Sequence, residues 1–179
     1  YCVGTAGENL SDFLDFLLNP GMQQLRSYLK GTKDFLLWVE RLKEQYPELP
    51  PLFGILTMDY SAMYVTMPDD LALPAVREYL NSRDTQIPST RSTMELLEVT
   101  RGNNYFEFGN RIFKQEGRSS IGKKHAPDAC CLAAGKLEED TILPSIEFQS
   151  VVLDDLSSCD DTERHYKRFI DDMIAATNC

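Results

Sequence analysis

The chain has 179 residues, of which 42% are apolar and 26% charged, a composition typical of a globular domain long enough to bury a core. Its five scattered cysteines and two histidines fit neither a zinc site nor a disulfide framework, and they favour a reducing compartment. The sequence has no run of 18 apolar residues, so it predicts no membrane span. A formal net charge of −10 argues against binding nucleic acid through overall charge.

Three helices are predicted in the first 50 residues. Apolar side chains recur at helical spacing in 9–18, and Pro20 suits the first turn of a second short helix that Gly31 ends. Thr32 is a good N-cap for the third helix, whose apolar positions are Phe35, Leu36, Val39 and Leu42. Prolines at 47, 50 and 51 then break the chain.

The remaining predicted elements are a mixture of strands and helices. In chain order they are a buried strand at 55–64, helices at 67–81 and 90–100, a hairpin of 105–108 and 111–115 turning at Gly109-Asn110, a loop at 116–125, a helix at 126–139, a strand at 146–151, an exposed acidic loop at 154–163, and a final hairpin turning at Asp171-Asp172. This order predicts an α+β fold in which helices back an antiparallel sheet.

Two of these apolar stretches carry aspartates, Asp59 in the first and Asp171-Asp172 in the last. A carboxylate beside a core is costly unless it has a partner, which is often a cation. If the two strands lie side by side, three carboxylates surround one or two hard cations, the arrangement used for phosphoryl transfer. Asp-Asp also favours turns for local hydrogen-bonding reasons, so the pair alone is weak evidence. The apolar residues on both of its flanks favour the metal site.

A basic strip lies in the middle of this acidic chain. Residues 111–124 contain one acid, Glu116, and five bases: Arg111, Lys114, Arg118, Lys123 and Lys124. Such a strip could follow a phosphate backbone, and a solvated hairpin and loop explains the same charges equally well.

Four ordered blocks resemble the palm of a known enzyme family. Phe169-Ile170-Asp171-Asp172 resembles the third palm motif of reverse transcriptases, which is Tyr/Phe-x-Asp-Asp in a β-turn. Residues 57–68 resemble the first palm motif in the version of Penelope-like retroelements. Residues 104–108 with 113–115 resemble the lead into the second motif, and residues 121–122 with 126–127 resemble its core. Residues 8–15 with 27–30 resemble the segment upstream of the palm. The resemblance therefore covers nearly the whole chain.

The resemblance implies an RNA-directed DNA polymerase that transfers a nucleotide from a dNTP to a primer 3′-hydroxyl on an RNA template. Residues 1–50 are then a helical segment from the fingers region, and 51–179 are the palm, with its antiparallel sheet backed by helices. By the same resemblance, Asp59, Asp171 and Asp172 are expected to bind two Mg²⁺ ions, which Mn²⁺ can replace. The biology of retroelements implies an intracellular, nuclear site of action without a membrane.

Other roles follow from the same resemblance. Tyr64 matches the side chain that blocks a ribose 2′-hydroxyl, although core packing in a strand is the plainer alternative. Tyr60, Gln115 and Gly122 lie near the nucleotide, and Phe169 lines the primer end unless it is simply a core aromatic. The residues expected to contact nucleic acid are Phe169 and the basic strip, Arg111, Lys114, Arg118, Lys123 and Lys124.

The second motif departs from the family pattern. Arg118 stands where the family has glycine, whose missing side chain lets the backbone approach the nucleotide. His125 stands where the resemblance implies a bulky apolar or aromatic residue, and it is expected to be structural. Arg118 and the net charge favour an alternative, a decayed or domesticated copy that binds nucleic acid or protein without catalysis. A further alternative is an unrelated α+β interaction domain with incidental aspartates.

The resemblance also implies that finger strands and a thumb lie elsewhere in a longer parent polypeptide. The chain starts after the former and stops seven residues after Asp172, just past the third motif. We therefore expect that this chain alone does not polymerise efficiently, even if its parent does.

Overall fold

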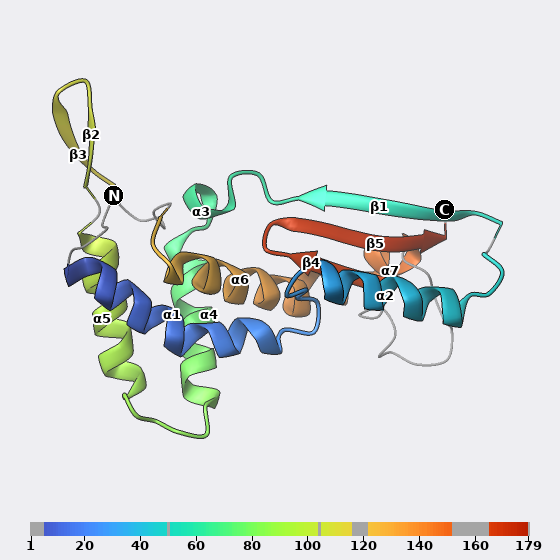
Figure 1. The fold of residues 1–179 in the computed structure, drawn as a ribbon, viewed down its shortest axis with the longest axis horizontal. Helices are drawn as coiled ribbons and strands as arrows, with labels where there is room; N and C mark the ends of the chain where they lie inside the picture. The colour runs from blue at the N-terminus through green and yellow to red at the C-terminus, as the bar shows by residue number, and fades with distance from the viewer. Residues whose placement is uncertain (1–5, 50, 104, 116–121, 152–164, 179) are drawn as a thin grey trace. The chain divides into compact units, whose positions relative to one another are not determined.

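The computed structural model describes residues 6–49, 51–103, 105–115, 122–151 and 165–178. These residues form α-helices and two antiparallel sheets, one of three strands and one of two, so the predicted α+β class is confirmed (Figure 1). None of the helices described combines the length and the apolar character that crossing a membrane requires. Residues 116–121 of the predicted loop at 116–125, and the whole predicted loop at 154–163, lie outside the described residues.

The chain divides into two compact units. The helical unit comprises residues 1–22 and 62–134, and the sheet unit comprises 23–61 and 135–179. Both α1 (Ala6–Gln24) and α6 (His125–Leu137) begin in the helical unit and end in the sheet unit. The expected division into a helical segment at 1–50 and a palm at 51–179 stays a prediction.

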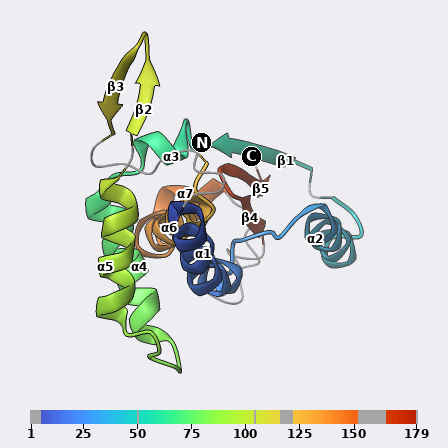
Figure 2. The same ribbon diagram turned by 60° about the vertical axis from the view of Figure 1, so that its left-hand side comes forward.

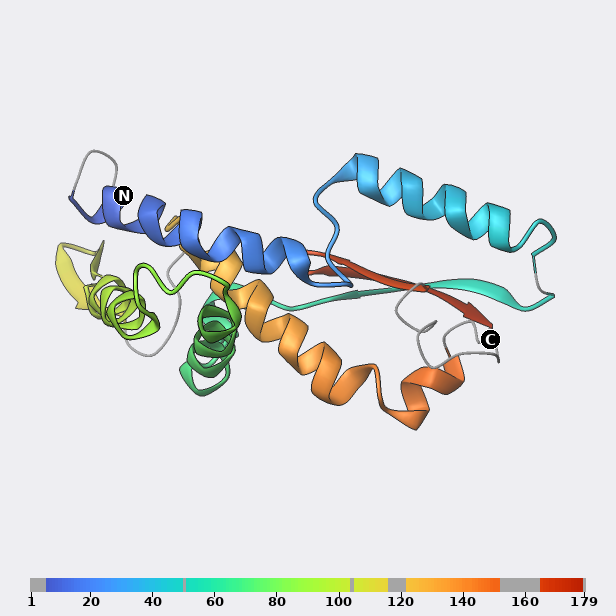
Figure 3. The ribbon, with the colours of Figure 1, turned by 90° about the horizontal axis from the view of Figure 1, so that it is seen from below.

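The sheet unit is built on three strands in the order β1-β5-β4, all antiparallel. Strand β1 (Phe53–Asp59) pairs with β5 (Asp172–Asn178) along its whole length, from Phe53 opposite Asn178 to Asp59 opposite Asp172. The hairpin partner of β5 is β4 (Tyr166–Phe169). The unit also contains α2 (Thr32–Gln45), a π-helical turn η1 (Glu138–Ile142) and α7 (Ile146–Val151). In Figure 3, α2 and α7 lie on opposite sides of the three strands.

The two faces of the three-stranded sheet differ in burial. Alternate residues of a strand point to opposite faces, and one face carries Tyr166, Arg168, Met173 and Ala175, all buried. Leu143 of the chain after η1 packs with this face, and so do the half-buried Met58, Tyr60 and Phe148. The other face carries Asp59, Asp172 and Phe169, which are exposed. The core of the unit therefore lies on the buried face of the sheet, and Asp59 and Asp172 lie on the opposite, exposed face.

The helical unit surrounds its own apolar core. Helices α4 (Asp69–Ser82) and α5 (Thr90–Gly102) pack on each other, and Val76, Leu80 and Leu97 are buried with Leu14 and Leu18 of α1. The one-turn helix α3 (Met63–Thr66) precedes α4. Strands β2 (Tyr105–Phe108) and β3 (Arg111–Lys114) form a separate hairpin (Figure 2). Cys130 and Cys131, both in α6, are fully buried.

Two predicted elements are wrong. Pro20 does not start a second helix but lies inside α1, because a proline removes only one helical hydrogen bond while Leu14, Leu17, Leu18 and Met22 bury a continuous face. Residues 146–151 are a helix rather than a strand. The Ser145 hydroxyl accepts the Phe148 backbone N–H at 3.1 Å, which is the cap that starts α7.

The first aspartate strand also differs from its prediction. It ends at Asp59 instead of continuing to Tyr64, since 63–66 turn into α3. Its apolar side chains are not deeply buried: Ile55 is 63% exposed, and Leu56 is also exposed. An edge strand has a neighbour on one side only, so an apolar sequence does not by itself ensure burial.

Candidate metal centre

The three predicted aspartates lie at one end of the three-stranded sheet. Asp59, the last residue of β1, lies opposite Asp172, the first residue of β5. The next pair along is bonded through the backbone, because the Tyr60 N–H donates to the Asp171 carbonyl at 3.0 Å. Hydrogen-bonded and non-hydrogen-bonded pairs alternate along an antiparallel ladder, so Asp59 and Asp172 form a non-hydrogen-bonded pair. Such pairs bring side chains of the same face closest together.

The β4–β5 turn places the third carboxylate. Phe169 pairs with Asp172, so the two-residue turn is Ile170-Asp171, not the predicted Asp171-Asp172. Ile170 has a φ of +55°, which suits the first central position of a type II′ hairpin turn. Asp171 is half-buried in the turn, and Asp172 is exposed at the start of the strand. The turn therefore presents two consecutive carboxylates beside Asp59.

The donor set fits a hard cation. Carboxylate oxygens are the ligands that Mg²⁺ and Mn²⁺ prefer, and both Asp59 and Asp172 are open to solvent. Across the described residues, however, no three Asp, Glu, His or Cys side chains already converge in a geometry that would hold a metal ion. The backbone brings the three aspartates to one edge, and rotation about their side-chain bonds is needed to direct all of them at one ion.

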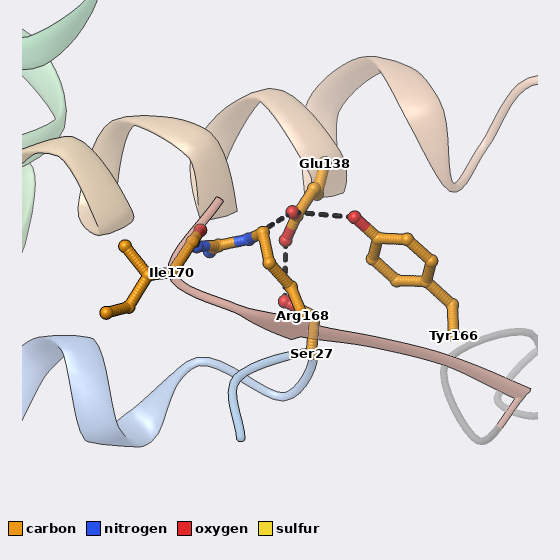
Figure 4. A network of polar contacts seen from close by, with 5 residues as sticks. All are labelled: Ser27, Glu138, Tyr166, Arg168 and Ile170. Carbon is orange, nitrogen blue, oxygen red and sulfur yellow. Dashed lines mark hydrogen bonds and ion pairs between the residues drawn. The ribbon is translucent and has the colours of Figure 1, made fainter. Parts of the chain in front are cut away.

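A polar network lies directly behind this turn, on the buried face of the sheet (Figure 4). Arg168 is 0% exposed and Glu138 is 1% exposed, and Arg168 Nε donates to Glu138 Oε1 at 2.5 Å. Tyr166 Oη donates to the same oxygen at 2.8 Å, and Ser27 Oγ donates to Glu138 Oε2 at 2.5 Å. A second guanidinium nitrogen, Arg168 Nη1, donates to the Ile170 carbonyl at 2.8 Å.

Sequence reasoning missed this network. The signal that could have indicated it is Arg168 two positions after Tyr166, on the same face of a strand, because a charge on a face that becomes buried needs a partner. The partner is 30 residues earlier in the chain, at the junction between α6 and η1. No local pattern connects Glu138 with Arg168, so only the folded sheet unit pairs them.

Tyr60 belongs to the same region. It is half-buried against the core of the sheet unit, and burial together with the negative charge of Glu138 raises its pKa to about 12. Among the described residues, none forms a hydrogen bond with its hydroxyl. Phe169, which is 41% exposed, projects from the same sheet face as Asp172. The nucleotide and primer roles of these two residues stay predictions.

The remaining nucleotide-site candidates lie in the helical unit. Tyr64 is half-buried in α3, so it is helical and not part of a strand. Gln115 follows β3 and is half-buried, and Gly122 is exposed with a φ of +97°, a conformation that favours glycine. Arg118 lies outside the described residues. The roles predicted for all four stay untested by the geometry.

The residues of the basic strip differ in their contacts. Arg111 and Lys114 are exposed on the β2–β3 hairpin. Lys123 instead donates to the Thr100 carbonyl, and Lys124 forms a 2.9 Å ion pair with Asp12. A phosphate group would have to compete with these intramolecular partners.

His125 is structural, as expected. It is buried at the start of α6, where Nδ1 lies 2.9 Å from the Ser11 hydroxyl and Nε2 lies 3.4 Å from the Thr100 hydroxyl. Burial and the positive charges of Lys123 and Arg101 lower its pKa to about 4. The imidazole is therefore neutral at physiological pH.

Comparison of the chain with models of protein families, with curated proteins and with solved structures gives no match.

Proposed function

We propose that this chain is the palm, with part of the fingers, of an RNA-directed DNA polymerase of the Penelope-like retroelement type. The observation that carries the proposal is the register that sets Asp59 opposite Asp172, with Asp171 bonded to the residue after Asp59. Two segments more than 100 residues apart, chosen from the sequence for their aspartates, are neighbours in one sheet. An interaction domain with incidental aspartates gives no reason for this coincidence.

In the proposed reaction, Asp59, Asp171 and Asp172 hold two Mg²⁺ ions at the solvent-facing end of the sheet. When bound, the ions activate the primer 3′-hydroxyl and neutralise charge on the triphosphate and the leaving pyrophosphate. Phe169, exposed on the same face as Asp172, packs against the primer end. Arg111 and Lys114 on the β2–β3 hairpin neutralise backbone phosphates. The partners are an RNA template, a DNA primer and a dNTP, and the site of action is nuclear.

Mn²⁺ binding by the 179-residue chain, followed by electron paramagnetic resonance, tests the metal site. We expect binding by the wild-type chain and a loss of at least about tenfold in affinity in both Asp59→Asn and Asp172→Asn, because each removes a ligand charge. Asp70→Asn, an exposed acid in the first turn of α4, is the matched control and leaves affinity unchanged. Equal binding by all four proteins contradicts the proposal.

RNA-templated primer extension by the longest natural polypeptide containing this chain tests the reaction. Extension that Asp171→Asn abolishes and Asp70→Asn retains supports a polymerase. Extension that appears only after Arg118→Gly indicates a palm disabled at its second motif. Mn²⁺ binding without extension in any variant contradicts the polymerase and favours the non-catalytic copy that Arg118 suggests.

A further inference from the structure

We infer that Arg168 and Glu138 form a buried clamp that positions the Ile170-Asp171 turn, and with it the carboxylates of the metal centre. The consequence for metal binding rests on the proposed function. The effect on the turn itself does not, since it follows from contacts within the sheet unit.

The turn has a conformation that its own sequence disfavours. Ile170 has a φ of +55°, and a β-branched residue in that region is a clear outlier because its side chain crowds the backbone. Such a conformation persists only where the surrounding structure determines it. The Arg168 guanidinium supplies that determinant by donating to the Ile170 carbonyl at 2.8 Å.

Arg168 is itself fixed on every side. Its backbone N–H donates to the Ser27 carbonyl and its carbonyl accepts the Leu29 N–H, both at 2.7 Å. Its side chain is held by Glu138, which Tyr166 and Ser27 also contact through their hydroxyls (Figure 4). An ion pair with both partners buried contributes little net stability compared with apolar side chains of the same volume. Because the Arg168–Glu138 pair contributes little net stability, orienting the turn is a function that accounts for its presence.

The clamp acts from behind the sheet. Arg168 points to the buried face, whereas its neighbour Phe169 and the paired Asp172 point to the exposed face. Arg168 therefore contacts no ligand of the proposed metal and is a positioning residue. Its influence passes from the Ile170 carbonyl, through the peptide bond, to Asp171, whose own carbonyl accepts the Tyr60 N–H.

Hydrogen exchange of the Tyr60 amide tests the clamp without any metal. The double variant Arg168→Met/Glu138→Leu replaces the ion pair by apolar groups of similar volume, which keeps the sheet unit folded. We expect Tyr60 protection to fall about tenfold or more, while the Leu56 amide, in the same strand, changes less than about twofold. Arg91→Met, which breaks the exposed Arg91–Glu95 pair, is the control and alters neither amide. The conservative Arg168→Lys, which keeps the charge, behaves as an intermediate.

Mn²⁺ affinity of the same proteins tests the consequence. We expect the double variant to bind at least about tenfold more weakly while Arg91→Met binds normally. Unchanged Tyr60 protection in the double variant refutes the clamp. Reduced protection with unchanged affinity refutes its role in positioning the carboxylates. If the wild-type chain itself binds no Mn²⁺, the proposed function fails, and Tyr60 exchange alone decides whether the clamp exists.

Discussion

Neutralising Asp59 should stabilise the metal-free protein. Asp59 and Asp172 form a non-hydrogen-bonded pair on one face of the sheet, where opposing side chains are about 5 Å apart. Both are exposed, so the dielectric of water applies, and two like charges at that distance repel by about 0.8 kcal/mol. Asp59→Asn removes the repulsion with almost no change in shape. For a chain of this length the gain is about 2–3 °C in Tm.

Thermal unfolding in EDTA at neutral pH and low ionic strength measures this gain. Asp172→Asn should give the same increase, and the double variant should add little, because the first substitution already removes the repulsion. In 1 M salt the difference should vanish, since charges are screened over about 3 Å. Saturating Mn²⁺ should reverse the order, because the wild type binds the ion more tightly and then gains more binding energy than the variant.

Asp70→Asn is a control for which the expected change in Tm has the opposite sign. This acid lies in the first turn of α4, where a negative charge favours the helix dipole, so its removal should lower Tm slightly. A decrease in Tm for Asp59→Asn at low salt, like the one expected of Asp70→Asn, would show that the two carboxylates do not face each other. The register on which the metal centre depends would then be wrong.

Three further outcomes are expected of the buried polar groups. Arg168→Met should cost about 3–5 kcal/mol by leaving the Glu138 charge unpaired, and the added Glu138→Leu should restore most of it in denaturant titrations. Burial and the adjoining Asp15 raise the pKa of Asp128 to about 8, so this group stabilises the fold below pH 4 and loses that contribution as pH rises towards 8. Asp128→Asn should therefore gain stability at pH 7 and remove that slope. Burial lowers the pKa of His125 to about 4, so the neutral imidazole contributes stability that is present above pH 6.5 and is lost as the pH falls to 4. The denaturant midpoint of His125→Gln should not show this loss of stability.

Much of the architecture was predicted from sequence because local physics fixes it. The Gly109-Asn110 turn was predicted since both residues tolerate positive φ, and they have φ values of +59° and +60°. Helices α2, α4 and α5 follow from apolar spacing and clear breaks in the chain. The sequence also predicts that the two aspartate segments are neighbours, because charges inside apolar runs need a partner, and β1 pairs with β5.

The tertiary structure decided what depends on distant residues. Pro20 stays inside a helix because burial of one face outweighs a single lost hydrogen bond, and Ile170 has positive φ although nothing in its own side chain favours it. The pairing of Arg168 with Glu138 joins positions 30 residues apart that no periodicity links. Sequence determines the elements and the need for partners, because propensity and desolvation are local. Which partner satisfies each charge is decided only when the chain packs.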